Sequence, residues 1–216
     1  MENRDNIFPI IMSRTTKGIL YLILSAFFFA AMAVFVRLGG DLPFIQKAFF
    51  RNSVSFIIAL VLILKEFHKT KDKNVFLIPK GALLFLILRS TGGTLGIFGN
   101  FYAIDRLVLS DASILNKMSP FFAIFFSFII MKEKIKPIPL IVIITAFLGS
   151  LLIVKPSFNF TQMLPTFAGF MGGVGAGLAY ACLRKLSSLN CNGKLVVLFF
   201  SAFSMIIISY SEKSVQ

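Results

Sequence analysis

The sequence predicts an all-α membrane protein of about seven transmembrane helices, in which a five-helix unit is followed by the start of an inverted second five-helix repeat. Its 216 residues are 57% hydrophobic and only 14% charged, with a mean hydropathy of +0.87, whereas soluble domains carry about 25% charged residues. The apolar residues form long continuous runs, whereas the strands of membrane barrels alternate between apolar and polar residues. These observations exclude a soluble globule and a disordered chain, and they argue against a barrel.

Each apolar run approaches or reaches the ~20 residues that a helix needs to cross the hydrocarbon core. In chain order the predicted spans are residues 19–36, 44–64, 82–103, 112–131, 138–154, 164–183 and 195–210. The first run follows a basic segment, as a signal peptide would. It is longer than a typical apolar signal region of about 7–15 residues, however, and no A-x-A cleavage site follows it. We therefore expect it to remain as the first helix.

The positive charges indicate the orientation. Of the 22 lysines and arginines, 14 lie in the N-terminal tail and in the loops after the second, fourth and sixth spans, and five lie on the opposite side. This bias predicts a multi-pass protein of the inner (cytoplasmic) membrane with a cytoplasmic N-terminus. The net charge of +13 is then a topology signal, with attraction to the lipid bilayer as a secondary effect. We expect no nucleic-acid partner, because the lysine-rich loop has no interleaved aromatic residues.

The domain organisation follows from a short polar segment after the fifth span. We divide the chain into a cytoplasmic tail (1–18), a first five-helix repeat (19–155), a linker (156–163) and a partial second repeat (164–216). Because five is an odd number, the second repeat would be inverted relative to the first. Inverted repeats are a recurrent design of secondary transporters.

Three cations remain, Arg51, Arg89 and Lys117, and all lie inside predicted spans that contain no acidic residue. A charge at the bilayer centre costs at least ~2.5–3.5 kcal/mol on insertion scales, so it usually faces protein or water and serves a function. We interpret the three as candidates for a cationic cavity that binds a carboxylate or phosphate. The alternatives are snorkelling of Lys117 and Arg51 to the membrane surface, or bonding to carbonyls at helix ends.

Neutral polar residues extend this candidate site. Asn100 and Tyr102 close the third span, and Asn116 adjoins Lys117 in the fourth. Pro120 removes a backbone donor and should kink the fourth helix, as in transporters whose discontinuous helices form the binding site. A kink that serves packing alone is the alternative. We expect the site among spans 19–36, 82–103, 112–131 and 164–183.

Two glycine stripes at four-residue spacing indicate close helix packing. They are Gly92 and Gly96 in the third span, and Gly169, Gly173 and Gly177 in the sixth. Small residues let helices approach closely in lipid. The stripes are interpreted as packing surfaces, or as contacts that slide while the cavity changes sides.

Enzyme chemistry finds no support in the sequence. The spans hold no carboxylate pair and no histidine, and no phosphate-binding loop is present. Cys182, Cys191 and His68 lie in or beside cytoplasmic loops, where a disulfide is not expected and where they cannot complete a zinc site. We therefore expect neither cofactor nor metal.

Several segments together resemble a known family. Residues 99–120 (GNFYAIDRLVLSDASILNKMSP), the turn Lys132-Glu133-Lys134-Ile135 and the triplet Phe49-Phe50-Arg51 resemble EamA-type members of the drug/metabolite transporter superfamily. The resemblance implies ten helices with both ends in the cytoplasm, so a chain with about seven looks C-terminally shortened. It also implies that Glu133 holds a cytoplasmic turn and that Arg51 has a structural or gating role.

The sequence thus predicts a secondary transporter that moves a small polar metabolite, anionic or zwitterionic, by alternating access. The alternative is a non-transporting membrane subunit or an inactive truncated remnant, and a membrane-embedded lipid enzyme ranks third. A homodimer stays open, as do the substrate, the direction and the coupling ion.

Overall fold

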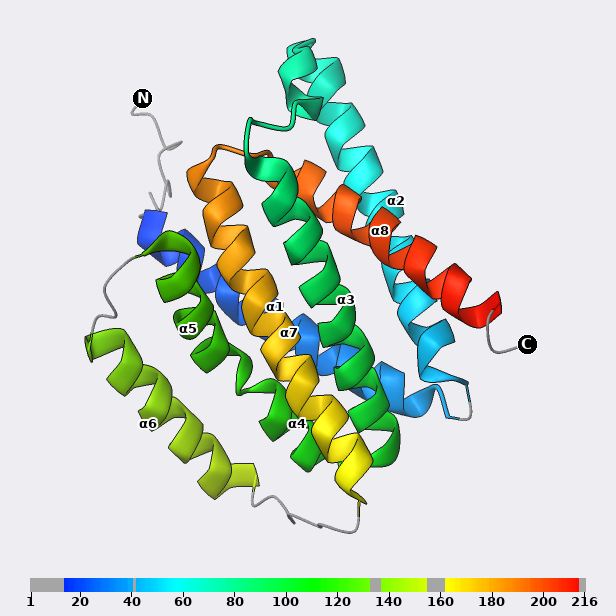
Figure 1. Cartoon of the computed structure of the whole chain (residues 1–216), viewed down its shortest axis with the longest axis vertical. Helices are drawn as coiled ribbons and strands as arrows, with labels where there is room; N and C mark the ends of the chain where they lie inside the picture. The colour runs from blue at the N-terminus through cyan, green and yellow to red at the C-terminus, as the bar shows by residue number, and fades with distance from the viewer. Residues whose placement is uncertain (1–13, 41, 133–136, 155–161, 214–216) are drawn as a thin grey trace, which may run out of the picture.

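The computed structural model describes residues 14–40, 42–132, 137–154 and 162–213 (Figure 1). Within these residues every regular element is a helix. In order they are α1 (Arg14–Leu38), α2 (Phe44–Thr70), the 3-10 helix η1 (Lys73–Phe76), α3 (Ala82–Arg106), α4 (Leu109–Asn116), α5 (Ser119–Met131), α6 (Pro137–Val154), α7 (Met163–Ser188) and α8 (Gly193–Lys213). Glu133 lies outside the described residues, as does most of the proposed linker.

The described part of the chain contains six helical segments that are long and apolar enough to cross a membrane, with α4 and α5 together forming one of them. The shorter apolar helix α6 adds a seventh segment over Pro137–Leu152. The predicted all-α membrane fold is therefore confirmed. Helices α2 and α7 continue beyond the predicted spans to Thr70 and Ser188, because the Lys, Arg and Glu residues at their ends are good helix formers.

The fourth predicted span is broken rather than merely kinked. Helix α4 ends at Asn116, and α5 begins at Ser119 with Pro120 in its first turn. Proline has no N–H to continue the helical ladder but fits well at a helix start. The interruption is thus greater than the kink predicted from Pro120, and the position of Pro120 within the first turn of α5 explains why the chain restarts there.

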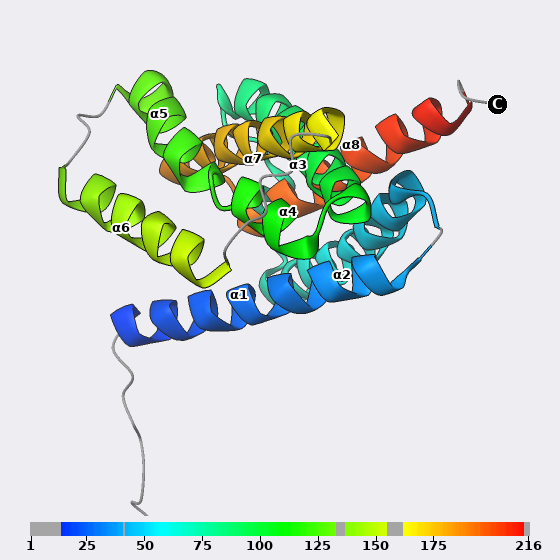
Figure 2. The same cartoon turned by 90° about the horizontal axis from the view of Figure 1, so that it is seen from below.

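Helices α3 and α7 meet backbone to backbone in the middle of the bundle (Figures 1 and 2). A Cβ atom added to Gly92 would lie 2.9 Å from the carbonyl oxygen of Gly175, and one added to Gly96 would lie 3.1 Å from the amide nitrogen of Ala176. One added to Gly172 would lie 2.9 Å from the amide nitrogen of Asn100. We call the contact between Gly92, Gly96 and Gly99 of α3 and Gly172, Gly175 and Ala176 of α7 the glycine seam.

The predicted stripe on α7 faces a different neighbour. Gly173 lies against the carbonyl oxygen of Leu115, just before the break, and a Cβ atom there would be 2.9 Å from it. Gly169 packs on the side chain of Leu115 and also on Ala103 of α3, and Gly177 packs on Phe122 of α5. Helix α7 therefore turns Gly172 and Gly175 toward α3, turns Gly173 and Gly177 toward the broken helix, and places Gly169 between the two.

Polar contacts tie the helices together at opposite ends. Lys47 of α2 forms an ion pair with Asp105 of α3 at 2.7 Å, and Arg37 of α1 donates to the carbonyl oxygen of Ile104 at 2.6 Å. At the other end of α2, Glu66 pairs with Lys194 of α8 at 2.9 Å. Between the ends, Asn52 donates to the Ser204 hydroxyl at 2.9 Å. Helix α8 is thus attached along α2.

Candidate functional site

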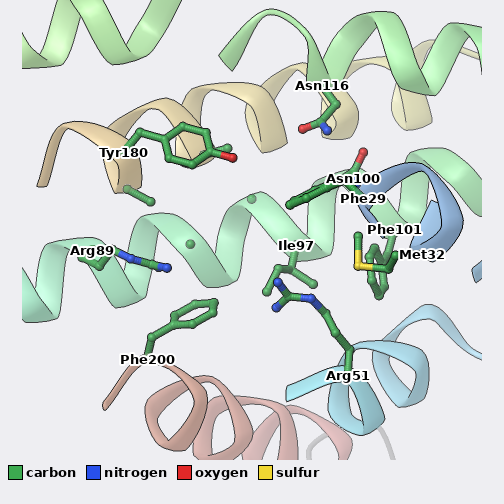
Figure 3. Close-up of a pocket in the computed structure, with 14 residues that line it drawn as sticks. Phe29, Met32, Arg51, Arg89, Ile97, Asn100, Phe101, Asn116, Tyr180 and Phe200 are labelled. Atoms are coloured by element: carbon green, nitrogen blue, oxygen red, sulfur yellow. The ribbon is translucent and has the colours of Figure 1, made fainter. Parts of the chain in front are cut away.

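A cavity of about 90 Å³ lies between six of these helices, α1, α2, α3, α4, α7 and α8. Its polar side chains come from Arg51, Arg89, Asn100, Asn116 and Tyr180 (Figure 3). The rest of the lining is apolar or small and consists of Phe29, Met32, Gly93, Gly96, Ile97, Phe101, Ala176, Ala179 and Phe200. A mostly apolar cavity with a few polar groups is the usual composition of a small-molecule site.

The two arginines of the cavity converge on one aromatic ring. The Cζ atom of Arg89 lies 4.2 Å from the centroid of the Phe200 ring, and that of Arg51 lies 6.0 Å from the same centroid. Figure 3 shows both guanidinium groups pointing toward the middle of the cavity, Arg51 from α2 and Arg89 from α3. Cation–π contact within about 6 Å is attractive, so Phe200 holds two positive charges beside the cavity.

The two arginines differ in their remaining partners. Arg51 donates a 2.9 Å hydrogen bond to Oδ1 of Asn52, which in turn donates to Ser204. The Nε atom of Arg89 is buried and has no hydrogen-bond partner. A buried donor without an acceptor costs about 1–3 kcal/mol, and more when it is charged. Of the two cavity arginines, Arg89 is therefore the one with a buried donor that an anion could satisfy.

Gly93 makes room for this arrangement. A Cβ atom at Gly93 would lie 2.5 Å from Nη1 of Arg89 and 2.7 Å from Cε2 of Phe200. Any larger residue would therefore displace the guanidinium, the ring or both. The absence of a side chain at Gly93 is what lets Arg89 and Phe200 lie together over α3.

The neutral polar residues come from three helices and complete the polar lining. Asn100 is on α3, Asn116 is the last residue of α4, and Tyr180 is on α7. Amide and hydroxyl groups both donate and accept hydrogen bonds. None of the described residues that line the cavity is acidic. The cavity therefore combines two positive charges with uncharged donors and acceptors.

Four of the six predicted binding candidates meet in this cavity, namely Arg51, Arg89, Asn100 and Asn116. Lys117 does not, because it caps the end of α4 with an exposed side chain. Tyr102 does not line it either: its ring packs edge-on against Phe44 at 5.3 Å and lies near Arg106.

Of the residues predicted to serve gating or packing, Gly96 lines the cavity and the others lie outside its lining. Gly96 belongs both to the glycine seam and to the cavity wall. Gly92 lies in the seam, while Gly169, Gly173 and Gly177 pack on α4 and α5. Pro120 stands in the first turn of α5, just past the break beside Asn116. The cavity wall thus includes both a tight helix contact and the end of a broken helix.

Sequence reasoning missed Tyr180, Phe200 and Gly93. Tyr180 carries a signal that could have been used, since it is one of four tyrosines and lies inside a span that is mostly apolar. Phe200 is one of 27 phenylalanines, and nothing in its neighbourhood distinguishes it. Gly93 falls beside the Gly92–Gly96 stripe rather than on it, so periodicity directs attention to its neighbours.

Membrane-length helices around a cavity that two arginines line define a multi-pass membrane protein with a charged internal cavity. The chain belongs to the EamA-like transporter family, whose model matches residues 16–155. The predicted resemblance is therefore confirmed.

Relatives with transporter names extend the match beyond this domain. The chain is 30% identical to the pseudopaline exporter CntI of Pseudomonas aeruginosa over 193 residues, which cover 89% of this chain and 65% of the exporter. It is 29% identical to human solute carrier family 35 member G1 over 201 residues, which cover 90% of this chain and 53% of the carrier. An uncharacterized transporter of Helicobacter pylori is 26% identical, covering 88% of this chain and 62% of that protein. The chain thus spans between about half and two thirds of the length of these relatives.

No solved structure gives a significant match to the chain.

Proposed function

We propose that the chain acts as a secondary transporter that moves a small polar metabolite, anionic or zwitterionic, by alternating access. One observation carries the proposal: Arg51 and Arg89 both reach a cavity shared by six helices, and no acidic residue among the described lining neutralises them. Intramembrane charges are retained where they serve a solute or ion pathway. Membership of a transporter family supports the same function.

The helices around the cavity supply parts that a carrier needs. The cavity is lined both by helices of the proposed first repeat and by α7 and α8 of the proposed second. In many carriers the solute lies between repeats that rock against each other. The break after Asn116 provides a joint in the wall at which α5 can change its angle to α4. The excess of lysine and arginine in alternate loops supports a cytoplasmic N-terminus in the inner membrane.

Counterflow in proteoliposomes tests the proposal. The purified full chain is reconstituted in neutral lipid, and labelled dicarboxylates, phosphate monoesters, amino acids and organic cations are offered in turn. We expect an anion or zwitterion to accumulate in these liposomes and not in empty ones. We also expect Arg89→Ala to abolish the accumulation, because the cavity loses the guanidinium whose Nε atom has no acceptor.

Arg106→Ala is the matched control, because Arg106 is an exposed arginine on the same helix and lies outside the cavity lining. It should retain counterflow. Failure of every solute to accumulate would contradict the carrier function. Preference for cations, or full activity of Arg89→Ala, would contradict the role given to the cavity charge.

A further inference from the structure

The net charge of the cavity limits which solutes it can neutralise. Two guanidinium groups contribute two positive charges, and the other polar groups, Asn100, Asn116 and Tyr180, are amides or a phenol. Arg51 and Arg89 share the Phe200 ring, so both charges act on the same small volume. Like charges held close together in a medium of low dielectric repel each other, and the repulsion is relieved by negative charge placed between them.

Solutes of different charge fit this arrangement unequally. A monoanion leaves one guanidinium without a counterion. A zwitterion also brings an ammonium group, which the described lining meets with two arginines and no carboxylate. A solute with two negative charges gives each guanidinium an anionic partner, and arginine is well suited to bind carboxylate or phosphate through two parallel hydrogen bonds.

We propose that the cavity selects a dianionic solute, a dicarboxylate or a phosphate monoester, over monoanions and zwitterions. This proposal rests on the proposed function to the extent that the cavity is the solute site. Arg51 and Arg89 bind the two charges, and the amides of Asn100 and Asn116 with the Tyr180 hydroxyl bind the uncharged polar part. Phe200 and Gly93 are positioning residues, because they set where the Arg89 guanidinium lies.

The size of the cavity further restricts the solute. At about 90 Å³ it is smaller than the ~150 Å³ cavity that accommodates benzene in an engineered protein. It therefore encloses a compact dianion of a few carbon atoms, or the anionic head of a larger solute. Small probes suit the test for this reason.

Ligand-dependent thermal stabilisation of the purified full chain in neutral detergent tests the charge rule. The dicarboxylate arm compares succinate with monomethyl succinate and 4-aminobutyrate, which keep a four-carbon acid skeleton but carry one negative charge or a compensating ammonium. The phosphate arm compares methyl phosphate with dimethyl phosphate. At neutral pH we expect a dianion to bind at least about tenfold more tightly than its matched monoanion, since hydrogen bonds to a charged group are strong. The arm with the larger preference identifies the anionic group.

Two single-charge variants attribute the preference to the arginines. Arg51→Gln and Arg89→Gln should each reduce it to about twofold or less, whereas Arg106→Gln should leave it unchanged. The wild-type protein provides a second measurement that needs no variant to fold. Phenylglyoxal modifies accessible arginines, and mass spectrometry reads each site. Succinate or methyl phosphate should protect Arg51 and Arg89 but not Arg106.

The proposal is overturned if monoanions or 4-aminobutyrate bind as tightly as the dianions, if no probe binds, or if the dianions leave Arg51 and Arg89 unprotected. These results are separate from the transport assay. Counterflow of an amino acid without dianion preference would reject the charge rule and leave the carrier function standing. Dianion binding without counterflow of any solute would support the charge rule and contradict the carrier function.

Discussion

Glycine residues have different roles on two faces of α3: on one they allow close backbone contact, and on the other they leave space for side chains. On the face toward α7, Gly92, Gly96 and Gly99 bring backbone against backbone, and the nearest atoms in the contact are backbone atoms. On the neighbouring face, Gly93 leaves a space that the ends of the Arg89 and Phe200 side chains fill. Peptide groups locked in two helices cannot move aside independently, whereas the ends of long side chains can. The comparison predicts that the seam determines whether the helices assemble, and that the space over Gly93 determines what the cavity binds.

A large side chain placed in the glycine seam should have the largest effect on the stability of the molecule. In Gly175→Leu the added side chain meets the carbonyl oxygen of Gly92, which a Cβ atom would already approach to 2.7 Å. Overpacking a core typically costs about 1–3 kcal/mol, and rigid backbone on the opposite side raises the cost to about 3 kcal/mol or more. We expect loss of the monodisperse protein in detergent, measured by size-exclusion chromatography, and a strongly lowered Tm.

Gly149→Leu is the control for this substitution. Gly149 lies on α6, and a Cβ atom there would meet nothing within 4 Å. The same side chain should therefore be accepted without a loss of Tm. A Gly175→Leu variant as stable as Gly149→Leu would show that α3 and α7 are not held in backbone contact.

A single methyl group at Gly93 should change binding without disturbing assembly. In Gly93→Ala the methyl group displaces Nη1 of Arg89 and the edge of the Phe200 ring, both of which belong to side chains that can rotate. Alanine is also a better helix former than glycine, by about 1 kcal/mol. We expect Tm to stay near the wild-type value while succinate affinity falls about tenfold, as for loss of one charged hydrogen bond.

Gly149→Ala, which meets open space, should leave succinate affinity unchanged and raise Tm slightly through the same gain in helix propensity. Unchanged affinity and unchanged phenylglyoxal reactivity of Arg89 in Gly93→Ala would contradict the positioning role of this glycine. A collapse of Tm would instead assign Gly93 to the seam.

The sequence predicts which helices and intramembrane charges the molecule contains better than it predicts which helix faces pack together. Run length and low charge predict the apolar helices because lipid leaves few other ways to satisfy the backbone. The cost of a buried charge leads directly to Arg51 and Arg89. Spacing on α7 predicts a close-packed stripe but not its neighbour: Gly173 and Gly177 pack on α4 and α5, while Gly172 and Gly175 face α3. Which face of a helix meets which partner is decided by tertiary packing.

Asn116 and Lys117 show the same limit at the scale of one residue. Asn116 is the last residue of α4 and Lys117 is its C-cap, and both are predicted to bind the solute, yet Asn116 lines the cavity and Lys117 is exposed. Successive residues on a helix point about 100° apart, since 3.6 residues make a turn, so two neighbours rarely share a small cavity. The rotation of α4 about its own axis decides which of the two residues faces the cavity. The glycine contacts with α7 set that rotation.

The ion pair between Glu66 and Lys194 lies outside both the seam and the cavity, and it should give the smallest effect. Their side chains are 32% and 40% exposed, and solvent screens such pairs strongly. Glu66→Gln keeps the shape of the side chain and an oxygen that can still accept from Asn192 and Lys194. We expect counterflow, succinate affinity and Tm all to remain close to wild type.

The pair between Lys47 and Asp105 is the matched contrast, because its side chains are only 6% and 17% exposed. Lys47→Gln leaves a partly buried carboxylate without its cation. Lys47→Gln should therefore lower Tm by several degrees, again without changing the dianion preference. If Glu66→Gln altered solute affinity as much as Gly93→Ala does, the attachment of α8 to α2 would control the position of Phe200, and binding could no longer be ascribed to the space over Gly93 alone.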